Sequence, residues 1–228
     1  MDATLTPTFS AGEGVIAAGE LRHRLSSTSY KLDGSLTYGS DDGGDKDAPR
    51  GHIRGDLLHE FDRTWRGGAD IFFSTDDTYL RRYNIESIDT LENRLYMEGF
   101  RERSYAAVNA YYFQGLRGTD DPGNTPIVFP KLDYNYVARP DRFGGQWSVN
   151  AGFLALTRTD GTDSKRLSGI TKWELPHTTR HGDVYRFFSS LQTDAYLASD
   201  VVDSDDPNRI LSGFSYRLFP QAGVDWRL

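Results

Sequence analysis

Two adjacent carboxylates, a tyrosine and two arginines lie close together in the stretch "FFSTDDTYLRRYNIES", as Asp76, Asp77, Tyr79, Arg81 and Arg82. Neighbouring carboxylates can act as a general acid and a general base when their surroundings drive their pKa values apart. Adjacent side chains of an extended chain point to opposite faces, so these two could share a substrate only across a turn. We favour the simpler interpretation, a solvated loop that caps a hairpin. Its arginines would pair with these carboxylates or with anionic groups of a ligand.

Two acidic segments have the composition of calcium-binding loops. Their carboxylates are Asp41, Asp42, Asp45 and Asp47, and Asp200, Asp203, Asp205 and Asp206. Neither segment has the residue order of an EF-hand loop. His177 and His181 share one predicted turn but lack the spacing of a dedicated zinc site. The sequence also has no GxSxG, P-loop or GxGxxG motif, so we expect no cofactor, no metal site and no enzymatic activity.

Composition narrows the class of protein further. The 228 residues fit one β domain or two small domains, and the net charge of -7 disfavours nucleic-acid binding. The absence of cysteine excludes disulfides and thiolate metal sites. No apolar run approaches the roughly 20 residues of a membrane helix. The first residues lack the basic and apolar regions of an export signal, so we expect none in this chain.

Apolar and polar residues alternate with a period of two through most of the sequence, whereas helical periodicity is almost absent. Such alternation predicts strands with one apolar and one polar face. In the segments 29–38 and 146–157, the residues expected on the apolar face are Leu32, Leu36, Val149 and Phe153. Those expected on the polar face are Lys31, Asp33, Ser148 and Asn150.

The pattern predicts about twelve strands, at residues 3–9, 15–25, 29–39, 51–61, 64–75, 87–101, 104–115, 127–138, 146–158, 164–175, 183–197 and 210–227. Short connections such as 26–28 and 102–103 alternate with long ones such as 76–86 and 116–126, although 160–163 is a short connection at a long position. This alternation is typical of an outer-membrane β-barrel, which has short periplasmic turns and long outer loops. The strands also reach the roughly 9–11 residues that a tilted spanning strand needs.

A large soluble β-meander or sandwich would show the same alternation. Two features favour the membrane barrel. The second face is polar along whole strands, as expected for a water-filled lumen, and aromatic residues lie near strand ends, where they suit the lipid headgroup level. These aromatic residues are Tyr30, Tyr38, Trp65, Phe73, Trp147, Trp173, Tyr185 and Trp226.

Several segments, in their order along the chain, carry a resemblance to a known family. They are "TLTPTFSAGEGVIAAGELRHR", "GSLTYGSDDGG", "STDDTYLRRY", "YAAVNAYYFQGLRGTDDPGNTPIVFPKLDYNYV", "LALTRTDGTDSKRLS" and "WELPHTTRHGDVY". Together they resemble the β-barrel domain of the LPS-assembly outer-membrane protein family, LptD (older names OstA or Imp), of an alphaproteobacterial kind. The pieces "STDDTYLRRY" and "FPKLDYNY" are the most specific.

The resemblance implies a role in inserting lipopolysaccharide into the outer leaflet. In this family a barrel of about twenty-six strands follows a periplasmic jellyroll and holds a plug lipoprotein in its lumen. Lipid enters through the jellyroll and leaves by a lateral opening between the first and last strands. The chain has fewer strands, no jellyroll and none of the cysteines that strap jellyroll to barrel in some members, which implies a fragment of the barrel wall.

We therefore predict an all-β chain, an antiparallel up-and-down meander of long strands that forms part of a transmembrane β-barrel. Residues 1–228 would be a single barrel segment of the cell outer membrane, with no signal peptide or jellyroll domain in this chain. The sheet is expected to be open or to close under strain. Alternatives that the residues leave open are an unrelated porin, a phospholipase-like barrel and a soluble β-rich binding module.

The resemblance also suggests partners and ligand contacts. The expected partners are lipopolysaccharide, outer-membrane lipid, the plug lipoprotein and the periplasmic components of the lipopolysaccharide-transport bridge, and not nucleic acid. The residues expected to contact ligand are Arg81, Arg82, Asp76, Asp77 and Tyr79. Arg81 and Arg82 would be the phosphate anchors, through charge-assisted hydrogen bonds.

Overall fold

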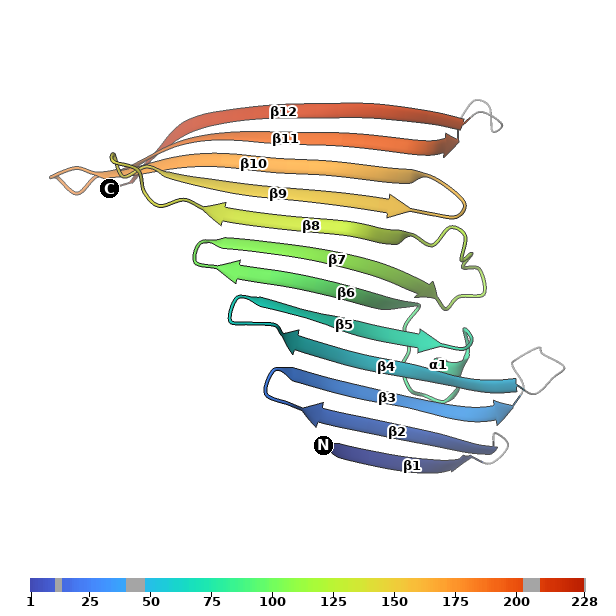
Figure 1. The fold of residues 1–228 in the computed structure, drawn as a ribbon. Coiled ribbons are helices and arrows are strands. Elements are labelled where there is room, and N and C mark those ends of the chain that lie inside the picture. The colour runs from blue at the N-terminus through green and yellow to red at the C-terminus, as the bar shows by residue number, and fades with distance from the viewer. Residues whose placement is uncertain (11–13, 40–47, 203–209, 228) are drawn as a thin grey trace. The chain divides into compact units, whose positions relative to one another are not determined.

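The computed structural model describes residues 1–10, 14–39, 48–202 and 210–227, which form twelve strands and one short helix (Figure 1). The strands are β1 (Asp2–Ser10), β2 (Gly14–Arg24), β3 (Thr28–Gly39), β4 (Ala48–Glu60), β5 (Trp65–Ser74), β6 (Thr90–Arg101), β7 (Ser104–Gly115), β8 (Ile127–Val137), β9 (Gln146–Thr157), β10 (Asp163–Thr178), β11 (Val184–Val202) and β12 (Ile210–Arg227). The helix α1 (Tyr79–Arg82) lies between β5 and β6 in the sequence.

All twelve strands belong to one sheet whose strand order follows the chain from β1 to β12. Each strand therefore pairs with its neighbours in the sequence, and the predicted all-β antiparallel meander is confirmed. Among the described strands no ladder joins β1 to β12, as expected for an open sheet.

The internal contacts of the chain define two compact units. Unit 1 contains Met1–Met97, Ala110–Ile127 and Arg158–Asp160, and unit 2 contains Glu98–Asn109, Val128–Thr157 and Gly161–Leu228. Strands β1 to β5 and helix α1 lie in unit 1, and β9 to β12 lie in unit 2.

The strand register of unit 1 confirms the predicted facing of its side chains. Leu36 lies opposite Ala17 of β2, on the apolar face, and its side chain is 57% exposed. Its neighbour Ser35 lies opposite His52 of β4 on the other face, where the two side chains share a hydrogen bond of 2.8 Å. The alternation of the sequence therefore gives a sheet with one apolar and one polar face.

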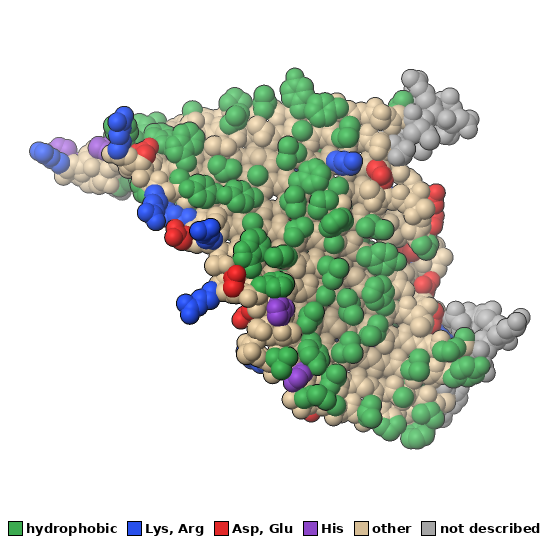
Figure 2. Space-filling model, in the orientation of Figure 1, with side chains coloured by type: hydrophobic (Ala, Val, Ile, Leu, Met, Phe, Trp, Pro, Cys, Tyr) green, Lys and Arg blue, Asp and Glu red, His purple; other side chains and the backbone are tan. Residues whose placement is uncertain are grey.

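The same two faces are present in unit 2. Phe153 of β9 lies opposite Leu167 of β10 on the apolar face, whereas Asn150 lies on the polar face and is hydrogen-bonded to Asn135. Asp194 of β11 is buried on the polar face and accepts a hydrogen bond from Arg217 at 2.8 Å. Figure 2 shows hydrophobic side chains spread across the visible face of the strands. Because these side chains are exposed rather than packed, the apolar face requires an apolar environment.

A small buried cluster forms where α1 covers part of unit 1. Its fully or nearly fully buried members are Phe72, Tyr79, Leu80, Leu91 and Leu116. This cluster holds the helix and its flanking loop against the strands. Within the described ranges, no helix is long and apolar enough to cross a membrane.

Candidate functional site

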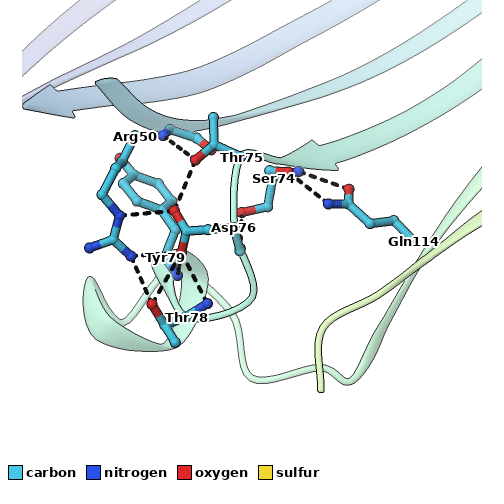
Figure 3. Close-up of polar contacts among 8 residues, drawn as sticks. Arg50, Ser74, Thr75, Asp76, Thr78, Tyr79 and Gln114 are labelled. Carbon is cyan, nitrogen blue, oxygen red and sulfur yellow. Dashed lines mark hydrogen bonds and ion pairs between the residues drawn. The ribbon is translucent and has the colours of Figure 1, made fainter. Parts of the chain in front are cut away.

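The loop between β5 and β6 is fixed by an ion pair to the start of β4. The Arg50 guanidinium donates from Nε to Oδ2 of Asp76 at 2.9 Å and from Nη2 to Oδ1 at 2.6 Å (Figure 3). It also donates to the Thr78 hydroxyl at 2.7 Å. The Arg50 side chain is only 3% exposed and that of Asp76 17%. Because both hydrogen bonds run between two planar groups, the pair fixes the direction of the loop as well as its position.

Asp76 also organises the first turn of α1. Its Oδ1 accepts hydrogen bonds from the backbone N–H groups of Thr78 at 3.1 Å and Tyr79 at 2.8 Å, and its Oδ2 accepts one from the Thr75 hydroxyl at 3.0 Å. Burial opposes ionisation of this carboxyl, but the hydrogen bonds from Arg50, Thr75 and Thr78 outweigh that effect. They hold the pKa of Asp76 well below its usual range. The carboxylate is therefore charged throughout the physiological range.

This depressed pKa makes one contribution to stability depend on pH. The folded chain holds the proton of Asp76 more weakly than the unfolded chain, whose aspartates have a pKa of about 3.9. The stabilisation is complete above that value and is lost as the pH falls through the folded pKa. We expect the difference in unfolding free energy between the wild type and Asp76→Asn to be constant near neutral pH and to shrink below about pH 4. Urea unfolding in detergent across this range measures it, and a difference independent of pH would contradict the assignment.

The side chain of Tyr79 anchors α1 to the polar face of the sheet. Its ring is completely buried. Its hydroxyl shares a hydrogen bond of 2.7 Å with Ser35, which in turn is bonded to Nδ1 of His52 at 2.8 Å. Burial raises the pKa of the Tyr79 phenol, which keeps it neutral. A chain of three hydrogen-bonded side chains thus ties the helix to β3 and β4.

Ser35, His52 and Asp33 have the residue types of a hydrolytic triad but not its geometry. The distance between Nε2 of His52 and Oδ2 of Asp33 is 3.9 Å, beyond hydrogen-bond length. The Ser35 side chain is buried, and its hydroxyl is covered by that of Tyr79. A nucleophile needs room for an acyl carbon beside its oxygen, and here Tyr79 fills that position. The arrangement is a structural link rather than a catalytic centre.

Replacing Tyr79 by phenylalanine removes only the hydroxyl of this link. We expect a loss of about 1 kcal/mol of unfolding free energy, the usual contribution of one hydrogen bond, because Ser35 keeps His52 as a partner. Tyr38→Phe is the matched control, since the Tyr38 side chain is 68% exposed on the apolar face. Urea unfolding of the two variants in the same detergent measures the difference. Equal stability of the two variants would contradict the role given to the Tyr79 hydroxyl.

The second half of the loop is held by a different set of charges. Arg81 donates to Asp89 at 2.9 Å and to the carbonyl oxygen of Leu116 at 3.1 Å, and Arg117 donates to the other oxygen of Asp89 at 2.5 Å. The hydrogen bond from Arg117 lowers the pKa of Asp89. Arg54 of β4 forms a further ion pair with Glu86. The loop is therefore tied to the strands and to the connection that follows β7.

The structure brings the five predicted site residues onto one loop but gives them different surroundings. The expected pairing of Asp76 with Arg81 is not found: Asp76 pairs with Arg50, and Arg81 pairs with Asp89. Tyr79 is buried, Asp77 and Arg82 are half-buried, and Arg81 is exposed. Whether the five contact ligand stays a prediction.

The metal hypotheses involve other segments. The carboxylates that lie outside the described residues are Asp41, Asp42, Asp45, Asp47, Asp203, Asp205 and Asp206, together with the side chain of Asp200. Within the described part of the chain, no three histidine or carboxylate side chains are grouped so that they could hold a metal ion.

Two amide side chains complete the hydrogen bonding at the end of β5. The Asn93 side chain accepts from the backbone N–H of Phe72 at 2.8 Å and donates to its carbonyl oxygen at 3.2 Å. Gln114 does the same for Ser74, at 3.2 and 2.7 Å (Figure 3). Backbone groups within a membrane wall must be satisfied by protein, and here side chains provide the partners that a neighbouring backbone normally supplies.

A meander of long antiparallel strands with one apolar and one polar face is the pattern of a transmembrane β-barrel wall. The loop on its polar face is fixed by ion pairs, as described above. A family model, described as LPS transport system D, LptD, matches residues 49–228. The chain belongs to the LptD family, whose members are non-enzymatic barrels of lipopolysaccharide transport in the outer membrane. A comparison with curated proteins finds no match.

The family match decides between the alternatives that the residues left open. It replaces the unrelated porin, the phospholipase-like barrel and the soluble binding module with one family. The matched range contains β5 to β12, α1 and all but the first residue of β4. The segments 4–24 and 34–44, which carry part of the resemblance, lie outside it.

Proposed function

We propose that residues 1–228 form a single segment of the barrel wall through which lipopolysaccharide reaches the outer leaflet, in an LptD protein of the alphaproteobacterial kind. The observation that carries this proposal is the two-faced sheet within the family match. Its apolar face suits lipid, and its polar face offers hydrogen-bonding groups to sugar and phosphate. The wall acts as a passive scaffold, and no residue performs a chemical step. The plug lipoprotein and the periplasmic bridge components are its proposed partners.

Site-specific photo-crosslinking in the native cell tests this role. A photoreactive residue at Asn150 lies on the polar face and is expected to capture lipopolysaccharide in transit. The same residue at the neighbouring Val149 lies on the apolar face and is the matched control. Adducts at both positions, or at Val149 alone, would overturn the proposed path.

Among the predicted contact residues, Arg81 and Arg82 are the proposed phosphate anchors, with Asp76, Asp77 and Tyr79 beside them. The Arg81 side chain is 43% exposed and already paired with Asp89. We therefore expect Arg81→Gln to weaken lipopolysaccharide binding in detergent only by about two- to fivefold, the effect of one exposed charge pair. Arg139→Gln is the control, since Arg139 is exposed in the turn after β8.

The comparison ligand is lipopolysaccharide from which the phosphates have been removed. Wild type and Arg81→Gln should bind it equally. If the variant loses affinity for this ligand as well, Arg81 supports the fold of the loop rather than contacting phosphate.

A further inference from the structure

Several arginines lie at the short-turn end of the unit 2 strands, and Arg142, Arg180 and Arg227 are three of them. Arg142 is in the turn between β8 and β9, Arg180 is in the turn between β10 and β11, and Arg227 ends β12. All three side chains are exposed. Within the described residues none of them forms an ion pair. In Figure 2, basic and histidine side chains lie at this end of the strands together with acidic ones. The short-turn ends of these strands therefore carry the positive charge of three arginines that form no ion pair within the described residues.

The carboxylates of the same turns are used within the turns. Asp141 accepts hydrogen bonds from the backbone N–H groups of Phe143 at 2.8 Å and Gly145 at 2.9 Å, and these bonds lower its pKa. Asp183 accepts from the hydroxyl of Thr179 at 3.2 Å. Both carboxylates thus shape their turns. Asp141 feels the charge of Arg142, but within the described residues neither carboxylate forms an ion pair with the three arginines, whose exposed guanidinium groups can reach an external anion.

Two tryptophans show where these strand ends meet a membrane interface. The indole Nε1 of Trp173 lies 3.4 Å from Oδ2 of Asp141, and that of Trp226 donates to Oδ1 of Asp183 at 3.1 Å. Each ring therefore directs its polar N–H to a turn and lies on the apolar face of the sheet. This is the orientation that tryptophan adopts between hydrocarbon and headgroups.

The partners of these tryptophans across the strands are aromatic as well. Trp147 lies opposite Trp173, and Tyr185 lies opposite Trp226. The three arginines are thus placed beside an aromatic belt, at the depth where lipid phosphates lie.

We propose that these strand ends bind the phosphate headgroups of anionic phospholipid in the leaflet at the short-turn side of the membrane. Guanidinium groups form charge-assisted, bidentate hydrogen bonds with phosphate. Phe143, which is 69% exposed and lies 4.6 Å from the Arg142 guanidinium, adds an apolar contact beside the charge. The proposal rests on the chain spanning the membrane but not on its handling of lipopolysaccharide.

An acidic protein could also bind arginines. The lipid is favoured because the arginines lie at the ends of the strands, beside the aromatic belt. At this level any strand that spans a membrane meets lipid headgroups. An acidic peptide is therefore included in the test as the competing ligand.

The test measures lipid binding by native mass spectrometry of the full chain in detergent, with phosphatidylglycerol and phosphatidylethanolamine of identical acyl chains. Each basic residue near a membrane surface changes anionic-lipid affinity by about fivefold. We expect the wild type to prefer phosphatidylglycerol by about tenfold or more. The triple variant Arg142→Gln, Arg180→Gln, Arg227→Gln should lose most of this preference. Arg139→Gln removes an exposed arginine of the same strand ends that is already paired with Glu102 at 3.6 Å, so it should reduce the preference less than Arg180→Gln does.

A second measurement covers the case in which the triple variant does not fold. The preference of the wild type should fall as salt rises, since exposed charges are screened, and Arg180→Gln alone should reduce it. A wild type that is folded in detergent but shows no preference would overturn the proposal and leave the membrane assignment intact. A preference that is undiminished in the triple variant would overturn it too. Salt-sensitive binding of polyglutamate without a lipid preference would replace the lipid with an acidic protein. A chain that enters no detergent or lipid would defeat the membrane assignment itself.

Discussion

Replacing Arg50 by methionine is expected to lower the unfolding free energy by about 3–5 kcal/mol, the usual cost of removing one partner of a buried ion pair. The Asp76 carboxylate would remain largely buried without its counter-ion, and the Thr78 hydroxyl would lose a donor. Methionine retains much of the length of the arginine side chain, so the change removes charge rather than volume. Urea unfolding in detergent, followed by tryptophan fluorescence, measures the loss.

Two further variants show whether the ion pair causes this loss. In the double variant Arg50→Met, Asp76→Asn the uncompensated charge is gone, so part of the stability should return. Arg139→Met is the control for an exposed arginine, because its pair with Glu102 is exposed on both sides. A change for Arg50→Met below about 1 kcal/mol, the value for surface pairs, would mean that the pair does not hold the loop.

The second large effect is expected when detergent is removed. In detergent-free buffer we expect the purified chain to aggregate, because apolar side chains cover one whole face of the sheet. Side chains such as Leu36, Phe214, Tyr216 and Trp226 are each more than half exposed. Patches of this kind exceed the few hundred Å² that soluble monomers usually expose. Unpaired edge strands would add intermolecular pairing.

Size-exclusion chromatography of refolded protein with and without detergent measures this behaviour. The detergent sample should give one symmetrical peak, and the detergent-free sample should elute in the void volume. A sharp monomer peak without detergent, together with cooperative thermal unfolding, would overturn the membrane assignment.

The strands could be predicted because the pattern that indicates a strand lies within the strand's own residues. A period of two across about ten residues fixes both the strand and the facing of its side chains. β10 extends to Thr178, beyond the predicted strand 164–175, and includes Pro176. In the structure Pro176 lies opposite Arg186 of β11, whereas the pairing of β10 with β9 ends at Glu174. The missing N–H of a proline is tolerated where only one neighbouring strand is paired.

The candidate site could be predicted only in part. The residues of the loop were evident, but α1 has four residues and is too short to show helical periodicity. Arg50, the partner of Asp76, lies 26 residues away, in a segment that resembled a loop boundary. Ser35 and His52 looked like ordinary polar-face residues, and the contact of Ser35 with Tyr79 spans 44 residues. Such partners depend on the packing of α1, which no local pattern encodes.

The meander also has a consequence for the order in which the chain folds. Because successive strands pair with one another, most ladders form between residues close in sequence, and the entropy lost in closing each hairpin is small. The sheet can therefore grow one hairpin at a time from any starting point. The contacts of α1 differ, because Tyr79 must find Ser35 and Arg81 must find Leu116 across 44 and 35 residues. The contact of Tyr79 needs β3 to be in place and that of Arg81 needs the end of β7, so docking of the helix completes unit 1 rather than nucleating it.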